Sequence, residues 1–156
     1  MRRKQITNVT IPDAMEILLK TYNQILVSFP SALPEAGGIL GCRTDGVVCA
    51  FRYDPGSGCS LSTVYEPNVA LLNKAIADWA AEGIAFCGII HSHLPCVELL
   101  SQEDLEYMDL ILNAMPQGIT QLYFPIMIPK EKILPFVARM GTDGIIVQKD
   151  TLNIIT

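Results

Sequence analysis

The chain has 156 residues, of which 50% are hydrophobic and 17% are charged, and its 11 basic and 16 acidic side chains give a net charge of −5. This length suits one domain with its own core, so we expect residues 1–156 to form a single domain. The negative charge offers no broad attraction to phosphate backbones, which excludes nucleic acid as a favoured partner. The longest apolar stretches are only strand-length, so we expect no membrane-spanning segment.

The cysteines and the N-terminal segment indicate the cellular compartment of the protein. The five cysteines are an odd set without a CxxC pair, which argues against a disulfide framework and against a four-cysteine zinc site. The basic start, Met1 to Gln5, is not followed by the apolar segment of a secretory signal. We therefore expect a reduced, cytoplasmic protein.

The first third of the chain predicts a helix and a hairpin. Apolar residues recur at mostly helical intervals over residues 11–29, which indicates an amphipathic helix. The glycine-rich residues 34–38 predict a flexible turn. Two apolar runs follow, 39–42 and 47–51, and the Asp45-Gly46 pair between them is typical of a hairpin.

The middle of the chain alternates loops, strands and helices. We predict a loop over 54–60, a strand over 61–65, a helix from Pro67 to near Gly83 and a buried strand over 84–90. A third helix is expected to begin at Ser101 and to stop before Pro116.

The last third of the chain predicts successive strands over 119–128, 133–139 and 145–147, with a C-terminal strand over 152–155. The whole order predicts a mixed α/β domain with about three helices around one curved sheet. The apolar first helix and the C-terminal strand are also candidates for the interface of a homodimer.

Both histidines of the chain lie two residues apart, at the end of the predicted buried strand over 84–90. Residues i and i+2 of an extended chain point to the same side, so His91 and His93 can converge on one ion. Two neutral imidazoles at this spacing leave room for a third ligand and a water. Alone, a His-x-His pair is weak evidence, because ordinary histidines also occur at strand ends.

A serine and an aspartate at the start of the third predicted helix give the candidate third ligand. Ser101 followed by Asp104 is typical of a capping box, in which serine and an acidic side chain satisfy the first backbone amides. A carboxylate fixed in a first helical turn is also well placed to bind a metal, so the two interpretations are compatible. Glu98, Glu103 and Asp109 are competing carboxylates.

Together, His91-x-His93, seven residues, Ser101, two residues and Asp104 form a pattern that resembles the signature of the JAMM (MPN+) metallopeptidases, a family that includes deubiquitinating enzymes. The segment around Glu35, PEAGGILG over 34–41, is similar to the glutamate segment of that family. Leu94 departs from the family pattern, which usually has proline there. The chain also lacks the long insertions with which linkage-specific deubiquitinases grip a second ubiquitin.

The resemblance implies a single MPN-like domain with a curved, mainly antiparallel sheet, about three helices and a cytidine-deaminase-like architecture. It also implies a Zn²⁺ ion bound by His91, His93 and Asp104, with Glu35 as general base and then general acid. Ser101 would donate a hydrogen bond to the oxyanion. The implied activity is a zinc-dependent peptidase or isopeptidase that cuts after the C-terminal tail of a ubiquitin-like or sulfur-carrier protein.

Other interpretations remain open at this point. A zinc nucleoside deaminase needs His-x-Glu and Pro-Cys-x-x-Cys, which position 93 and the residues after Cys96 do not supply. A thiol hydrolase using Cys96 beside a histidine is conceivable. A catalytically inert MPN-type scaffold and a zinc hydrolase of a small amide substrate are the remaining alternatives.

Overall fold

The computed structural model describes residues 14–30, 35–56, 65–94 and 96–156, and these form three helices and ten strands. The helices are α1 (Leu19–Ser28), α2 (Val69–Ala80) and α3 (Gln102–Ala114). The strands are β1 (Met15–Leu18), β2 (Gly37–Cys42), β3 (Val48–Asp54), β4 (Ala85–Ser92), β5 (Gln121–Tyr123), β6 (Ile126–Ile128), β7 (Lys132–Leu134), β8 (Phe136–Met140), β9 (Ile145–Lys149) and β10 (Leu152–Ile155).

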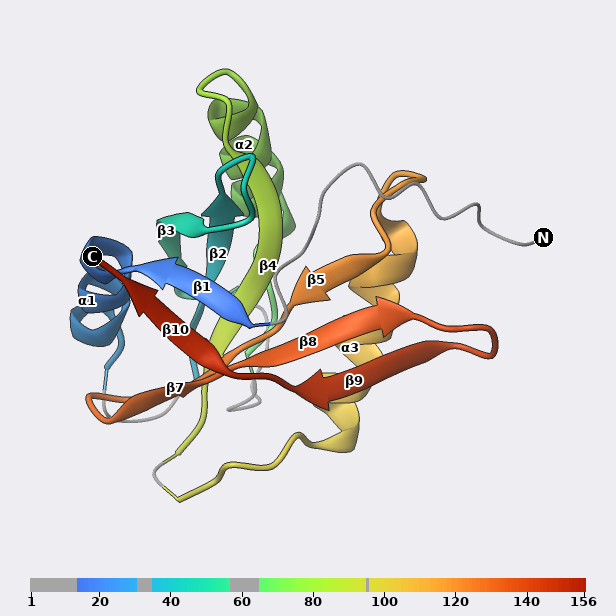
Figure 1. The fold of residues 1–156 in the computed structure, drawn as a ribbon. Coiled ribbons are helices and arrows are strands. Elements are labelled where there is room, and N and C mark those ends of the chain that lie inside the picture. The colour runs from blue at the N-terminus through green and yellow to red at the C-terminus, as the bar shows by residue number, and fades with distance from the viewer. Residues whose placement is uncertain (1–13, 31–34, 57–64, 95) are drawn as a thin grey trace.

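All ten strands belong to one sheet, in the order β10-β1-β3-β2-β4-β5-β8-β9, with β6 and β7 continuing from β4 (Figure 1). Antiparallel pairs join β2 to β3 and to β4, whereas β1 is parallel to both β3 and β10. The fold is therefore mixed α/β, which confirms the class predicted from the order of elements. No helix in the described ranges is both long and apolar enough to cross a membrane.

The central strands are buried on both faces because helices cover both. Figure 1 shows α1 beside β1 and β10, while α2 lies along β4 and α3 lies behind β8. Successive side chains of a strand point to opposite faces, so Leu40 and Ile90 pack with α1, whereas Ile39 and Ile89 pack with α2 and α3. This packing buries β2 and β4 at the centre of the sheet, and the two histidines lie at and just beyond the end of β4.

The helix predicted over 11–29 is wrong in its first part. Residues 11–13 lie outside the described residues, residues 15–18 form β1, and the helix begins at Leu19. Met15 and Ile17 are fully buried and pair in parallel with Leu152 and Ile154 of β10. The apolar residues of this segment also fit a helical spacing, which is why the sequence predicts a helix. Pairing with β10, more than 130 positions away in the chain, makes the segment a strand instead.

The predicted hairpin is confirmed, but the flexible turn before it is not. β2 and β3 are antiparallel, and Gly46 turns between them with φ of 86°. Gly37 and Gly38 lie inside β2, not in a turn. A β-carbon on Gly38 would come within 2.1 Å of the Phe51 ring, so this glycine permits close packing.

The predicted second and third helices are confirmed, and α3 begins after Ser101 as expected. The buried strand reaches further than predicted, since β4 includes His91 and Ser92. Of the strand predicted over 61–65, residues 61–64 lie outside the described residues and Tyr65 is not in a strand. Residues 57–60 of the preceding loop also lie outside them.

Two of the predicted C-terminal strands are each divided by a proline. The segment 119–128 contains β5 and β6 on either side of Pro125, and the segment 133–139 contains β7 and β8 on either side of Pro135. Proline has no amide hydrogen for the ladder, so a strand ends where it occurs. The break at Pro125 lets β5 and β6 pair with successive parts of β4.

Candidate metal centre

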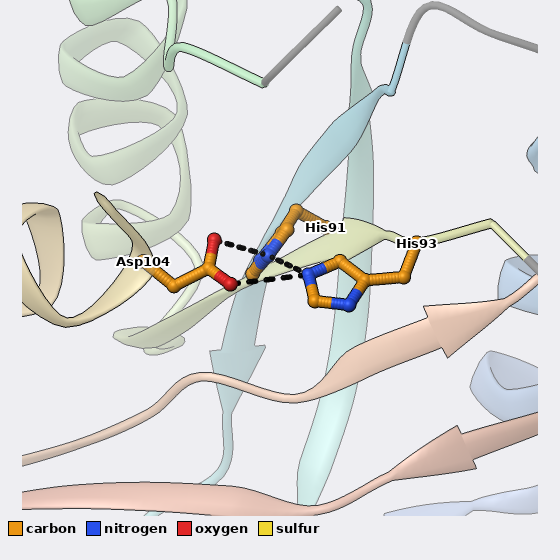
Figure 2. Close-up of side chains that lie close together, drawn as sticks. All are labelled: His91, His93 and Asp104. Carbon is orange, nitrogen blue, oxygen red and sulfur yellow. Dashed lines mark hydrogen bonds and ion pairs between the residues drawn. The ribbon is translucent and has the colours of Figure 1, made fainter. Parts of the chain in front are cut away.

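Three buried side chains, His91, His93 and Asp104, point toward one another (Figure 2). Their inner atoms are closely spaced: the two Nε2 atoms are 3.0 Å apart, His91 Nε2 lies 3.0 Å from Asp104 Oδ1, and His93 Nε2 lies 3.2 Å from Asp104 Oδ2. Histidine nitrogens and a carboxylate that converge in this way can bind a metal ion.

The end of β4 places the two histidines. His91 is the partner of Gly37 in β2, and its amide donates to the Pro125 carbonyl at 3.3 Å. The His93 amide, just beyond the strand, donates to the Met127 carbonyl at 2.9 Å. Backbone hydrogen bonds on both sides of β4 therefore fix the positions from which the imidazoles project.

Asp104 comes from the first turn of α3 and is fixed by a capping box. The Ser101 amide donates to Asp104 Oδ2 at 2.8 Å, and the Asp104 amide donates to Ser101 Oγ at 3.1 Å. The cap and the candidate metal ligand are thus the same carboxylate. Its side chain satisfies one backbone donor and still faces both histidines.

Each histidine has a hydrogen-bond partner on its outer nitrogen. His93 Nδ1 lies 3.0 Å from the Val97 carbonyl, and His91 Nδ1 lies 2.9 Å from the Tyr107 hydroxyl. Such outer partners orient metal-binding imidazoles and select the nitrogen that faces the metal. Here both outer partners leave the Nε2 atoms facing Asp104.

Tyr65 packs flat against His91 and is itself anchored. Its ring is stacked on the imidazole with centroids 6.2 Å apart and planes 10° apart, and its hydroxyl donates to the buried Asp54 carboxylate at 2.6 Å. Gly37 makes room for this ring, since a β-carbon there would come within 2.2 Å of it. The glycine segment therefore contributes space beside the histidine.

Glu35 lies on the same side of the molecule as the three converging side chains. The amide of the next residue, Ala36, donates to Ser92 Oγ at 2.9 Å, and the Ser92 amide donates to the Ala36 carbonyl at 2.8 Å. Burial raises the pKa of the Glu35 carboxyl, and attraction to His93 and His91 offsets this only in part. Such a carboxyl binds a proton more readily than an exposed one, which suits a group that takes up and returns protons.

A cleft of about 390 Å³ opens beside the candidate metal centre and contains Glu35, His93, Ser101 and Asp104 in its wall. Val97, Leu99, Gln102 and Glu103 complete its lining. Ser101 Oγ accepts a hydrogen bond from the Asp104 amide. The hydroxyl hydrogen of Ser101 can therefore be donated to a group in the cleft. All five residues singled out from the sequence therefore meet, three in the centre and two in the cleft wall.

The charges within the centre are strongly coupled. Burial alone would raise the pKa of Asp104, but hydrogen bonds from the two histidines lower it, so the carboxyl stays ionised. Burial alone would lower the pKa of His93, yet its bonds to Asp104 and Val97 raise it. A proton and a metal ion therefore compete for the same nitrogen of His93.

The sequence did not point to the two outer partners, Val97 and Tyr107, or to Tyr65, which stacks on His91. Tyr107 had a readable signal, because it follows Asp104 by three positions and so lies on the same face of the helix. Tyr65 had none, since tertiary packing brings it to the site, and Val97 had none, since it contributes only its backbone carbonyl, four positions after His93. Cys96 is exposed on the loop with φ of 70° and does not belong to the metal-binding group.

Comparison with known proteins shows a shared fold. The solution structure of protein DSY2949 from Desulfitobacterium hafniense is similar, with a TM-score of 0.63 and 21% sequence identity. The likeness covers 90% of this chain and 92% of that one, so the fold is shared along most of both. The sequence matches no protein-family model and no curated protein.

Proposed function

We propose that the protein is a zinc-dependent peptidase or isopeptidase of the JAMM type. The observation that supports this most is the convergence of His91, His93 and Asp104 beside a cleft that also contains Glu35 and Ser101. A hydrolytic zinc site has three protein ligands and one open position. A base and an oxyanion donor near that position complete the requirements for cutting an amide.

The spacing of the inner atoms fits zinc. With zinc–ligand distances of about 2.0–2.2 Å, a tetrahedral site separates neighbouring ligand atoms by about 3.3–3.6 Å. The distances between the three side chains, 3.0, 3.0 and 3.2 Å, need to widen only slightly to reach this range. Two imidazoles and one carboxylate are also a ligand set found in catalytic zinc sites.

A bound zinc ion would lower the pKa of a water molecule to about 7 and polarise the scissile carbonyl. Glu35 takes the proton of the attacking water and then returns it to the leaving amine. Its raised pKa favours the first step, because such a carboxylate takes up a proton more readily than an exposed one. The Ser101 hydroxyl donates a hydrogen bond to the oxyanion of the tetrahedral intermediate.

The finer architecture belongs to the same proposal. A mixed sheet covered by helices on both faces, with the histidine strand at its centre, is compatible with an MPN-like domain of the cytidine-deaminase-like type. The substrate we propose is the extended C-terminal tail of a ubiquitin-like or sulfur-carrier protein, cut at a peptide or isopeptide bond. An extended tail can add to a sheet beside the metal, and glycines near the cut fit a narrow cleft.

A hydrolysis assay on a panel of ubiquitin-like and sulfur-carrier tails, each joined to a reporter amine, tests this function. We expect the zinc-loaded protein to cut at least one tail, and a chelator to stop the cleavage. Restored cleavage after zinc is added back would tie the activity to the metal. Tail binding that is unaffected by the chelator, without cleavage in any condition, would instead indicate a scaffold.

A further inference from the structure

Cysteines lie on three adjacent strands, away from the proposed active site. Cys42 is the last residue of β2, Cys49 lies in β3 and Cys87 lies in β4. These strands are neighbours in the sheet, with β2 between the other two (Figure 1). In the ladder between β2 and β4, His91 is at one end and Cys42 is at the other. The proposed hydrolysis uses none of these thiols.

Cys42 and Cys87 lie on the same face of the sheet and close together. Cys87 packs against the core cluster that contains Leu40, and Cys42 follows Leu40 by two positions in β2, so it points to the same face. The register shifts beside Leu40, where Cys87 is an extra residue of β4 without a partner in β2. This bulge shortens the diagonal between the two cysteines, which in a regular ladder is about 7–8 Å. A disulfide spans Cα separations of about 4.4–6.8 Å, so the bulge favours one.

The two thiols share a hydrogen bond that makes them chemically unequal. The bond with Cys87 lowers the pKa of Cys42, whereas the same bond, together with burial, raises the pKa of Cys87. Cys42 is therefore the better thiolate and nucleophile, and Cys87 remains a thiol beside it. Cys42 is buried and Cys87 is partly buried, so a small oxidant reaches them more easily than a bulky one.

Cys49 provides a comparison on the other side of β2. Cys42 pairs with Val48 in β3, which leaves Cys49 without a partner in β2. Burial raises the pKa of the Cys49 thiol, and the charge of Cys42 adds to this. Among the described residues, Cys42 shares its thiol hydrogen bond with Cys87. We therefore expect Cys49 to stay reduced beside the pair.

We propose that Cys42 and Cys87 form a reversible disulfide when the protein meets hydrogen peroxide. The Cys42 thiolate attacks one peroxide oxygen, so an S–O bond forms, the O–O bond breaks and hydroxide leaves. The Cys87 thiol then attacks the sulfur of this sulfenic acid. The S–S bond forms, the S–O bond breaks, and the oxygen leaves as water with the proton of Cys87. Two electrons pass from the two sulfur atoms to the peroxide, and a dithiol reverses the oxidation by thiol–disulfide exchange.

Disulfide mapping of the full-length protein tests the pairing. The protein is treated with hydrogen peroxide, free thiols are alkylated, and tryptic peptides are compared by mass spectrometry with and without a dithiol. Trypsin cuts between Cys42 and Cys49, whereas Cys87 and Cys96 share one peptide. The mapping is therefore repeated with Cys96→Ser, which removes the exposed loop thiol. We expect peroxide to link the Cys42 peptide to the Cys87 peptide in both proteins, and the dithiol to separate them.

Two further variants test the roles of the thiols. In Cys87→Ser, Cys42 should accumulate as sulfenic acid that a cyclic diketone traps, because the second thiol is missing. Cys49→Ser is the matched control and should form the same link as wild type. A link from Cys42 to Cys49 would overturn the proposal, as would a Cys42 that remains free after peroxide has oxidised the exposed Cys96. The mapping needs neither zinc nor turnover, so its failure and that of the proposed function are distinguishable.

Discussion

Gly37 and Gly38 show how adjacent residues can serve opposite faces of one strand. A β-carbon on Gly37 would meet the Tyr65 ring beside His91, whereas one on Gly38 would meet the Phe51 ring in the core under α1. The sequence suggested a flexible turn here, because glycine runs are typical of turns. The reason for glycine at these positions is the close approach of the Tyr65 and Phe51 rings, which only the three-dimensional structure shows.

Replacing these glycines separates packing from metal binding. Gly37→Ala should cost about 1–3 kcal/mol of unfolding free energy through overpacking, and should also weaken zinc binding by shifting Tyr65 against His91. Gly38→Ala should cost a similar amount and leave zinc affinity unchanged. Denaturant unfolding and zinc titration measure the two effects. Equal zinc affinities in the two variants would contradict the role given to Tyr65.

Glu35→Gln is expected to keep the metal and to lower turnover at least about 100-fold, since a general acid–base group contributes about 100- to 10,000-fold. The assay is cleavage of a tail by the zinc-loaded variant, with zinc content measured on the same sample. Full activity in the variant would place the base elsewhere.

The same variant has a predicted effect on stability. Burial raises the pKa of the Glu35 carboxyl above its value in the unfolded chain, so the folded protein binds the carboxyl proton more tightly. The free energy of unfolding therefore falls as the pH rises from the unfolded pKa through the folded pKa. Glu35→Gln removes the cost of the buried charge. After chelation its Tm should exceed that of wild type at neutral pH, and the difference should shrink as the pH falls toward about 4, near the usual Glu pKa. A variant less stable than wild type at neutral pH would contradict this.

At the scale of elements, the parts that follow local rules were predictable. The Asp45-Gly46 hairpin, α2, and the cap of α3 by Ser101 and Asp104 depend on residues close in sequence. The convergence of His91 and His93 at a strand end could be predicted for the same reason, because the two residues are only two positions apart. Contacts between distant segments were not, as β1 shows by pairing with β10.

Substitution can separate the observed role of Ser101 as the cap of α3 from its proposed role as the oxyanion donor. Ser101→Ala should cost about 1 kcal/mol of stability, because an N-cap is lost, whereas Ser101→Gly should cost only a few tenths. Both variants lack the hydroxyl, so both should lose about 100- to 1,000-fold in turnover. Ser101→Thr should retain both functions. If turnover followed stability across the three variants, the hydroxyl would act only as a cap.

At the scale of the whole molecule, the metal centre joins segments from distant parts of the chain. It connects the end of β4 with the first turn of α3, and Glu35, which lies just before β2, lines the cleft beside it. A ligand that binds only the folded state stabilises it in proportion to its affinity. Zinc binding should therefore raise the free energy of unfolding of the whole domain.

Zinc at 100 times its Kd should raise the unfolding free energy by about 2.7 kcal/mol. Chelation should remove this gain, and thermal unfolding with and without chelator measures it. His93→Ala should show no such response, because one of the three ligands is lost. A wild type whose Tm does not change with zinc would show that the folded state does not bind it preferentially.

The most direct test of the central claim is the metal content of the protein purified without chelators. We predict near-stoichiometric zinc in the wild type and a large loss of zinc in His93→Ala. Wild-type protein that lacks zinc, or a variant that retains as much zinc as wild type, would contradict the zinc centre formed by His91, His93 and Asp104.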